Sequence, residues 1–205
     1  VPACIADGTL FQRVDVAALN GGDFDEIILA TGIAPRTPEI PGIDEGIAQG
    51  RVLRYVDVVS GRVSVGKSVA IIGAGGIGFD VAEFLSHGTT SASQNIEQFM
   101  REWGVDMSLQ ARGGIEGVSA EVEPSPRRIY LLQRKQTKVG ANLGKTTGWI
   151  HRLGLLKKNV QMISGCEYER IDAAGLHVRI NGEAKVLAVD NIVICAGQEP
   201  LRELV

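Results

Sequence analysis

The sequence contains little that points to disulfide, metal or membrane chemistry. Among its 205 residues are only three cysteines, Cys4, Cys166 and Cys195, which are widely spaced and form no CxxC pair. This count is too low for a cysteine-ligated iron–sulfur cluster, and it favours packing roles in a reducing compartment over a disulfide framework. No run approaches the ~18 apolar residues that a membrane helix requires. These patterns predict a cytoplasmic protein that uses no metal and enters no membrane.

The charge balance excludes another class of partner. A net charge of −3 leaves no basic footprint for nucleic acid, so none is expected as a partner. The 44% of hydrophobic residues can form a substantial core. The length suits one domain, or one domain with part of a second.

Residues that would carry acid–base, nucleophilic or metal chemistry are also scarce. His87, His151 and His177 lie far apart and form no metal-ligand pattern such as HExxH, and no GxSxG nucleophile motif is present. His177 alternates with apolar residues, which predicts a solvent-facing side chain. We therefore expect no catalytic or metal-binding residue in this chain. A hydride transfer between two bound cofactors is compatible with that absence, because the cofactors carry the chemistry.

The chain does contain a glycine loop between an apolar run and an amphipathic stretch. Residues 69–78 read VAIIGAGGIG, and Ile77, Val81, Phe84 and Leu85 share one helical face. A strand, a tight glycine turn and a helix N-terminus together form a pyrophosphate site. An alternative interpretation is a structural turn that uses glycine only for close packing. The candidate cofactor-binding residues here are Gly73, Ala74, Gly75, Gly76, Ile77 and Gly78.

Two segments on either side of this loop resemble each other. Residues 25–35 (DEIILATGIAP) and 190–200 (DNIVICAGQEP) align without a gap, although coincidence between two ordinary strand–turn segments is an alternative. Each predicts a buried strand that ends in small residues, then a glycine, then a proline. Small residues at the carboxyl end of a parallel strand let a ligand approach the backbone.

The rest of the pattern predicts an α/β domain. Asn181-Gly182 is a strong hairpin signal, because type I′ turns need a positive φ at both positions. Strands that alternate with helices and are followed by a meander indicate a mostly parallel sheet. The expected strands are 68–73, 128–134, 160–164, 167–171, 176–180, 185–189 and 191–195, and the expected helices are 76–86 and 147–157. Residues 52–59 are expected to form a short strand or a linker.

The path of the chain predicts one domain inserted into another. Residues 1–60 are expected to be a partial segment of the outer domain and a linker, and residues 190–205 a return segment to that outer domain. Residues 61–189 are expected to form a Rossmann-like three-layer domain with a parallel sheet and an antiparallel β-meander. Residues 87–126 are too long for a simple loop and indicate an insertion, with a short helix at 96–103. Contact with a partner domain and passive filling are equally supported roles for it.

The tip of the second strand predicts the type of dinucleotide. That strand ends in Gln133-Arg134-Lys135, with no acidic residue to bind the ribose 2′-OH of NAD. A phosphomonoester favours a guanidinium and an added ammonium, so NADP(H) is the expected cofactor. The loop lies about 55 residues before this tip instead of the usual ~20, which the insertion explains. The alternative is an ordinary solvated basic edge formed with Lys138.

Together these segments resemble the two-dinucleotide-binding flavoproteins, and more specifically the C-terminal part of the bacterial NADPH-dependent 2,4-dienoyl-CoA reductases. The resemblance covers about residues 24–204 and rests on EIILATGIAPRTPEIPGID, VAIIGAGGIGFDVAEFLS, SPRRIYLLQRKQTKVGANLGKTTGWIHR and GLHVRINGEAKVLAVDNIVICAGQEP. EWGVDMSLQ in the insertion is also similar to that family. Residues 1–23 match it poorly.

The resemblance implies a relay in which NADPH reduces FAD, a 4Fe–4S cluster passes electrons to FMN, and FMN reduces the dienoyl-CoA during fatty-acid β-oxidation. It implies that Thr31, Gly32, Ala196, Gly197 and Gln198 lie near FAD or nicotinamide, in an FAD site that is only partly present. The cluster and FMN would belong to a missing N-terminal part, so this chain alone is expected to be inactive. The rivals are the nucleotide module of a related flavin-dependent amine or enone oxidoreductase, and a non-catalytic NADP-sensing domain.

Overall fold

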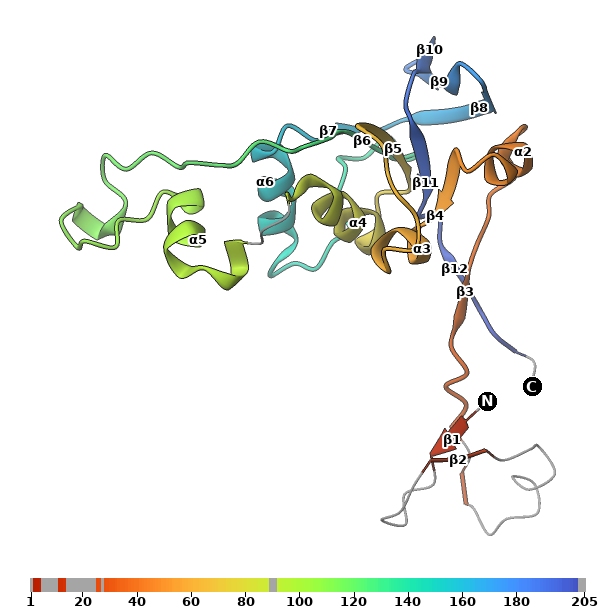
Figure 1. The fold of residues 1–205 in the computed structure, drawn as a ribbon, viewed down its shortest axis with the longest axis horizontal. Helices are drawn as coiled ribbons and strands as arrows, with labels where there is room; N and C mark the ends of the chain where they lie inside the picture. Colours follow the sequence, from red (N-terminus) through yellow and green to blue (C-terminus); the bar gives the residue numbers. More distant parts are fainter. Residues whose placement is uncertain (1, 5–10, 14–24, 27, 89–91, 203–205) are drawn as a thin grey trace. The chain divides into compact units, whose positions relative to one another are not determined.

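A computed structural model of the chain describes residues 2–4, 11–13, 25–26, 28–88 and 92–202. The chain divides into two compact units, one made of Val1–Arg36 with Gln198–Val205 and the other of Thr37–Gly197. The smaller unit holds two antiparallel strand pairs: β1 (Pro2–Cys4) with β2 (Phe11–Arg13), and β3 (Ile33–Pro35) with β12 (Gln198–Pro200). The larger unit carries the main sheet (Figure 1).

The main sheet has five parallel strands in the order β4-β11-β5-β6-β7. The strands are β4 (Val52–Arg54), β11 (Asn191–Ile194), β5 (Ser68–Ile72), β6 (Arg128–Leu132) and β7 (Gln161–Ile163). From β5 the chain passes through α4 (Gly76–Ser86) to β6 on one side, whereas β11 pairs with the other side of β5. The strand order therefore reverses between β5 and β11, which is where open α/β sheets bind ligands.

Alternating side chains of β5 pack into two different cores. Val69 and Ile71 join the core under the helices α3 (Tyr55–Val59), α4 and α6 (Gly148–Lys157). Ala70 and Ile72 join the core under an antiparallel meander on the other face. This period of two makes β5 apolar throughout, as expected for a strand that is buried on both faces. The result is a helix layer, a parallel sheet and a meander layer, which confirms the predicted α/β class.

The meander consists of β8 (Cys166–Asp172), β9 (Gly175–Ile180) and β10 (Glu183–Leu187). The predicted hairpin is present, since Asn181 and Gly182 have φ values of 51° and 85°. The expectation of a solvent-facing His177 is wrong. Its side chain is buried, and its Nε2 lies 2.9 Å from Oδ1 of Asp172, which gives the imidazole a partner inside the meander.

The predicted strand in residues 25–35 is not found in its expected place. Ile28 and Leu29 are 90% and 44% exposed, and β3 begins only after Gly32. A strand needs a partner for its backbone groups, and no strand of the described part of the chain pairs with residues 28–31. Its sequence counterpart, β11, has two parallel neighbours and is buried. Ile27 lies outside the described residues.

The larger unit extends beyond the residues predicted for the nucleotide domain. It includes α2 (Ile43–Ala48), and the segment 52–59 forms β4 followed by α3, a helix that was not predicted. It also includes β11, which pairs with β5. The compact unit therefore differs from the expected range 61–189. The assignment of 1–60 and 190–205 to an FAD domain stays a prediction.

The insertion contains the expected short helix, α5 (Ile96–Trp103). Asn95 begins it by accepting a hydrogen bond from the Gln98 N–H at 3.0 Å, and Gly104 ends it at a φ of 70°. Two 3₁₀ turns flank it, at Ala92–Gln94 and Arg112–Gly114. Met107 is 52% exposed. Contact of this insertion with a partner domain stays a prediction.

Candidate nucleotide-binding site

The glycine loop begins where β5 ends, between its two neighbouring strands. Gly73 has a φ of 109°, a conformation that favours glycine. Its N–H donates to the carbonyl oxygen of Leu132 at 3.1 Å, at the end of β6. A Cβ on Gly73 would overlap the carbonyl oxygen of Cys195, just after β11. Only glycine therefore allows the chain to turn at the point where the strand order reverses.

Gly75 and Gly76 have no such packing role. Both are exposed, and a Cβ added to either would meet no heavy atom within 4 Å. They lie at the start of α4, where no side chain caps the helix. The first turn of a helix presents N–H groups and a positive dipole end that bind anions. The backbone here is open to such a ligand, with Ala74 and Ile77 half-buried beside it.

Gly78 holds α4 close to the turn. A Cβ on Gly78 would overlap the carbonyl oxygen of Gly73 and lie 2.9 Å from the carbonyl carbon of that residue. Close packing thus accounts for Gly73 and Gly78, whereas it gives no reason for Gly75 and Gly76. The purely structural interpretation of the motif explains only half of its glycines. The predicted apolar face of α4 is only partly correct, because Val81 is buried as expected whereas Phe84 is 51% exposed.

The tip of β6 is braced by one side chain. The amide Nε2 of Gln133 donates to the carbonyl oxygen of Lys135 at 3.0 Å and to that of Thr137 at 2.8 Å. The carbonyl oxygen of Gln133 accepts the N–H of Cys166 at 2.9 Å. The sequence predicts a role for Gln133 only from its position at the end of the strand. Its role as a brace, and the involvement of Thr137, have no local sequence signal.

The braced loop presents positive charge. Arg134, Lys135 and Lys138 are exposed, and no carboxylate among the described residues lies within 4.0 Å of their charged groups. Because β6 is the direct neighbour of β5, this basic edge lies next to the strand that carries the glycine loop. An arginine with an adjacent lysine suits a phosphomonoester.

The return segment adds backbone rather than reactive groups. A Cβ on Gly73 would lie 3.3 Å from Cα of Ala196, so the structure brings Ala196 to the glycine loop. Burial raises the pKa of the neighbouring Cys195 thiol to about 12. A thiol with so little thiolate is a poor nucleophile. Gly197 follows with a φ of 111° and is the last residue of the larger unit.

The remaining predicted site residues, Thr31, Gly32 and Gln198, belong to the smaller unit. Oγ1 of Thr31 donates to the carbonyl oxygen of Leu201 at 2.5 Å, and the Leu201 N–H donates to the carbonyl oxygen of Gly32 at 3.0 Å. Gln198 begins β12, which pairs with β3. These contacts hold residues 31–35 and 198–201 together within that unit. The role of the three residues near FAD stays a prediction.

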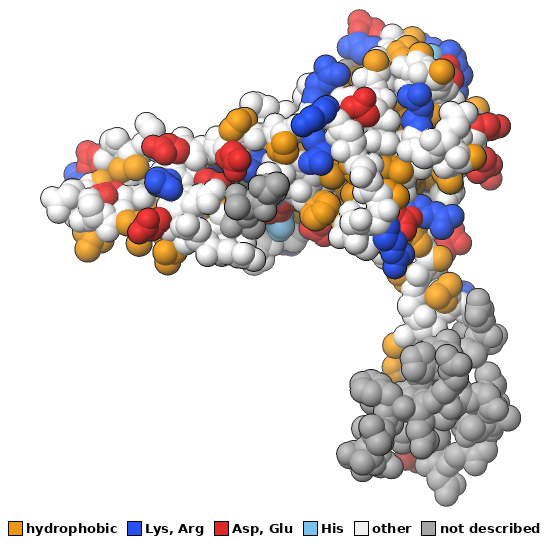
Figure 2. Space-filling view, in the orientation of Figure 1, with side chains coloured by type: hydrophobic (Ala, Val, Ile, Leu, Met, Phe, Trp, Pro, Cys, Tyr) orange, Lys and Arg blue, Asp and Glu red, His pale blue; other side chains and the backbone are white. Residues whose placement is uncertain are grey.

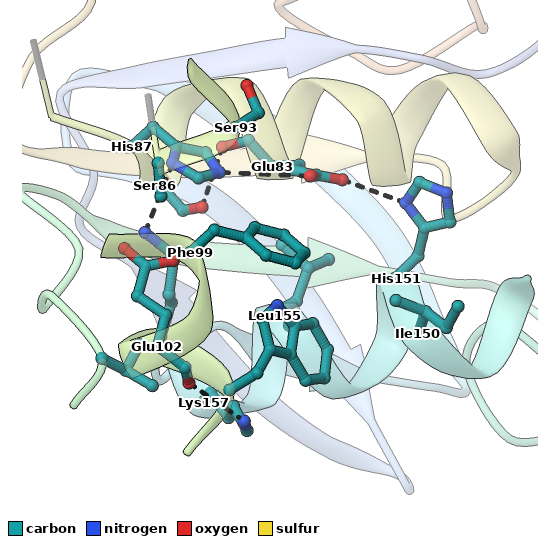
Figure 3. Close-up of a pocket in the computed structure, with 15 residues that line it drawn as sticks. Glu83, Ser86, His87, Ser93, Phe99, Glu102, Ile150, His151, Leu155 and Lys157 are labelled. Carbon is teal, nitrogen blue, oxygen red and sulfur yellow. Dashed lines mark hydrogen bonds and ion pairs between the residues drawn. The ribbon is translucent and has the colours of Figure 1, made fainter. Parts of the chain in front are cut away.

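A cavity of about 260 Å³ lies at the other end of α4 and was not predicted from the sequence. Its walls come from α4, α5 and α6 (Figure 3) and include Glu83, His87, Phe99 and Lys158. The part of the chain that the structure describes has no group of three or more His, Cys, Asp or Glu placed to hold a metal ion. None of its helices combines the length and apolar character needed to cross a bilayer.

The parallel sheet, the glycine turn and the uncapped helix N-terminus define a Rossmann-like α/β domain of the dinucleotide-binding class. The chain belongs to the pyridine nucleotide-disulphide oxidoreductase family, whose model matches residues 9–205.

Curated relatives cover most of this chain. A metal reductase from Desulforamulus reducens is 26% identical over 189 residues, which are 92% of this chain and 26% of that protein. A mercuric reductase from Bacillus cereus is 21% identical over 199 residues, or 94% of this chain and 25% of that protein. The chain thus spans about a quarter of the length of these relatives.

Solved structures share the fold. A 6-hydroxypseudooxynicotine amine oxidase from Pseudomonas geniculata N1 superposes with a TM-score of 0.61 at 17% identity, covering 94% of this chain and 24% of its own. A 2-naphthoyl-CoA reductase gives 0.58 at 20% identity, with coverages of 83% and 20%. A thioredoxin reductase from T. acidophilum gives 0.54 at 15%, with coverages of 85% and 45%. At these identities the likeness concerns the fold alone.

Proposed function

We propose that this chain is the NADPH-binding part of an NADPH-dependent 2,4-dienoyl-CoA reductase, in which hydride passes from NADPH to FAD for the reduction of unsaturated acyl-CoA. The observation that carries the nucleotide part of this proposal is the open loop at Gly75 and Gly76 beside the basic tip at Arg134 and Lys135. The chain would act as the electron-entry module and would not reduce dienoyl-CoA alone.

The residues present fit a pyrophosphate and a phosphomonoester. The pyrophosphate would lie against the backbone of residues 73–78, where an added Cβ at Gly75 or Gly76 meets only open space. Arg134 and Lys135 would bind the 2′-phosphate with charge-assisted hydrogen bonds. NADPH, when bound, supplies the hydride, and the protein contributes position and electrostatics. A hydride transfer from NADPH to a flavin requires no acid or base from the protein.

The CoA-thioester part of the proposal rests on the sequence segments that resemble dienoyl-CoA reductases. A solved 2-naphthoyl-CoA reductase has the same fold over 83% of this chain, so this fold occurs in another reductase that acts on a CoA thioester. In this proposal residues 1–60 are a partial FAD-domain segment and a linker, and residues 190–205 return the chain to the FAD domain, with Thr31, Gly32 and 196–198 near the flavin or nicotinamide. FMN and a 4Fe–4S cluster would be held by a separate part of the parent protein, which would be the partner of this module.

A second candidate is the nucleotide module of a related flavin-dependent amine oxidoreductase. The amine oxidase described above superposes with a TM-score of 0.61, so the fold does not distinguish a dienoyl-CoA reductase from an amine oxidoreductase. The basic strand tip favours a working NADPH donor site, because a module that binds only an ADP moiety needs no contact for a 2′-phosphate. A non-catalytic NADP sensor would keep the same nucleotide contacts but transfer no hydride to a flavin.

Calorimetric titration of the chain with NADPH and with NADH tests the nucleotide site. We expect NADPH to bind at least tenfold more tightly, about 1.4 kcal/mol, and Arg134→Ala to remove that preference while leaving NADH binding unchanged. Lys185→Ala is the matched control, because Lys185 is an exposed lysine on β10 of the meander. Equal affinities for the two nucleotides in the unaltered chain would contradict the proposal. A preference that persists in Arg134→Ala would show that another group binds the 2′-phosphate.

A further inference from the structure

The cavity at the C-terminal end of α4 combines an apolar body with a polar end. Phe99 of α5 and Leu155 of α6 line its apolar part, and Glu83 lies at its polar part (Figure 3). Trp103 and Lys158 also line the cavity. The glycine loop is at the opposite end of α4, so the two features are separate. With about 260 Å³, the cavity is slightly smaller than the ~300 Å³ at which pockets for drug-sized ligands begin.

Lys158 is a buried cation without an anionic partner among the described residues. It is 8% exposed, and its Nζ lies 3.5 Å from Nδ1 of His87. No described carboxylate lies within 4.0 Å of it. An ammonium group has three N–H donors, and burial of a charge is costly unless the charge is paired. Two donors of Lys158 therefore have no partner in the described structure.

Two other charged groups of the cavity wall, Glu83 and Lys157, have contacts of their own. Glu83 directs one carboxylate oxygen to Nδ1 of His151 at 3.0 Å and the other to Nε2 of His87 at 4.0 Å. Lys157 lies 4.3 Å from the ring centroid of Trp103 and donates to the carbonyl oxygen of Glu102 at 3.3 Å. The carboxylate of Glu102 also lines the cavity but forms no ion pair with Lys158. Lys158 is thus a buried ammonium in this wall that no described carboxylate within 4.0 Å neutralises.

Gly154 keeps the cavity open. It lies inside α6, lines the cavity, and a Cβ added to it would meet no heavy atom within 4 Å. Glycine weakens a helix interior relative to alanine, and here no packing requirement or unusual φ explains its presence. An open space bounded by aromatic rings and a buried ammonium is suited to a ligand.

We propose that this cavity binds a small carboxylate with a compact apolar body, such as a single aromatic ring. The carboxylate accepts hydrogen bonds from Nζ of Lys158, and the ring packs beside Phe99 and Trp103. The charge-assisted hydrogen bonds between the ammonium and the carboxylate make the site specific for an anion. Burial of the apolar surface of the ring contributes to the affinity. This site is independent of the nucleotide site and does not rest on the function proposed above.

Titration of the 205-residue chain with benzoate tests this assignment. Benzyl alcohol is the neutral analogue and benzylamine the cationic one. We expect saturable benzoate binding at least tenfold tighter than either analogue, and at least tenfold weaker binding in Lys158→Met, which keeps the aliphatic stem. Gly154→Leu, which places a side chain in the open space, should abolish binding. Lys185→Met, on the exposed edge of the meander, should leave it unchanged.

Three results would overturn the proposal. They are the absence of saturable benzoate binding, equal or tighter binding of benzyl alcohol or benzylamine, and undiminished benzoate binding in Gly154→Leu. Circular dichroism of each variant shows that it is folded. If Lys158→Met does not fold, Gly154→Leu decides the matter, because a leucine in that helix position favours the helix.

Discussion

The contact between Gly78 and Gly73 can be tested with a matched pair of glycine substitutions. In Gly78→Ala the new methyl group would overlap the carbonyl oxygen of Gly73 and lie 2.9 Å from its carbonyl carbon. In Gly154→Ala the new methyl group meets no heavy atom within 4 Å. Both residues are helical, in α4 and α6. Both substitutions therefore gain some helix propensity from the change of glycine to alanine. The difference between the two variants in the free energy of unfolding then measures the effect of the steric contact at Gly78.

The expected magnitude follows from these contacts. Gly154→Ala should raise the free energy of unfolding by about 1 kcal/mol, the difference in helix propensity. Overpacking costs about 1–3 kcal/mol, and Gly78→Ala belongs at the upper end because the overlapped atoms are backbone and cannot rotate away. The two variants should thus differ by about 3 kcal/mol. At ~2–4 °C per kcal/mol for a unit of this size, their Tm values should lie about 6–12 °C apart.

Differential scanning calorimetry and urea unfolding of the two variants measure this difference. Gly78→Ala should also weaken NADPH binding, because α4 must move away from β5 and its first-turn N–H groups move with it. Gly154→Ala should bind NADPH like the original chain. If Gly78→Ala proves as stable as Gly154→Ala, the reasoning that α4 depends on this close approach is wrong.

Three further predictions concern other groups. Gln133→Leu removes the brace of the β6 tip, so NADPH affinity in calorimetry should fall while the fold persists; an unchanged affinity would contradict preorganisation of this loop. The hydrogen bond from His177 lowers the pKa of Asp172 to about 2, so the stabilisation that the ionised carboxylate provides is present above pH ~4 and is lost as the pH falls toward 2. When the urea midpoint of unfolding is measured against pH, Asp172→Asn should reduce its fall at acid pH, and an unaltered fall would contradict this reasoning. Burial raises the pKa of Cys195 from 9.0 to about 12, which lowers its thiolate fraction roughly a thousandfold; iodoacetamide labelling followed by peptide mass mapping should be far slower than in the denatured chain.

Local signals were sufficient for most of the larger unit. The predicted helix at 76–86 coincides with α4, because the glycines before it and the apolar spacing within it act over a few residues. The hairpin at Asn181 and the short helix α5 are also set by neighbours along the chain. In such elements the residues that begin the element, end it and form its apolar face are close together in the sequence.

Elements that depend on distant partners were less predictable. Residues 25–35 and 190–200 have nearly the same pattern, yet only the second forms a buried strand, because only β11 has strands on both sides. The burial of His177 likewise depends on Asp172 across a strand pair, which periodicity does not reveal. The cavity beside Lys158 arises from three helices, and its only sequence trace is a glycine inside α6.

The turn at Gly73 links the proposed nucleotide site to the return segment beyond residue 190. This turn fits against the carbonyl oxygen of Cys195, and Cys195 donates its own N–H to the carbonyl oxygen of Ile72 at 2.8 Å. The end of β5 is therefore held by the return segment as well as by β6. A domain cut at residue 190 would remove β11 and leave one side of β5 unpaired just where the loop begins. The glycine loop thus belongs to a unit whose last strand lies about 120 residues further along the chain, and the geometry proposed to bind NADPH depends on that strand.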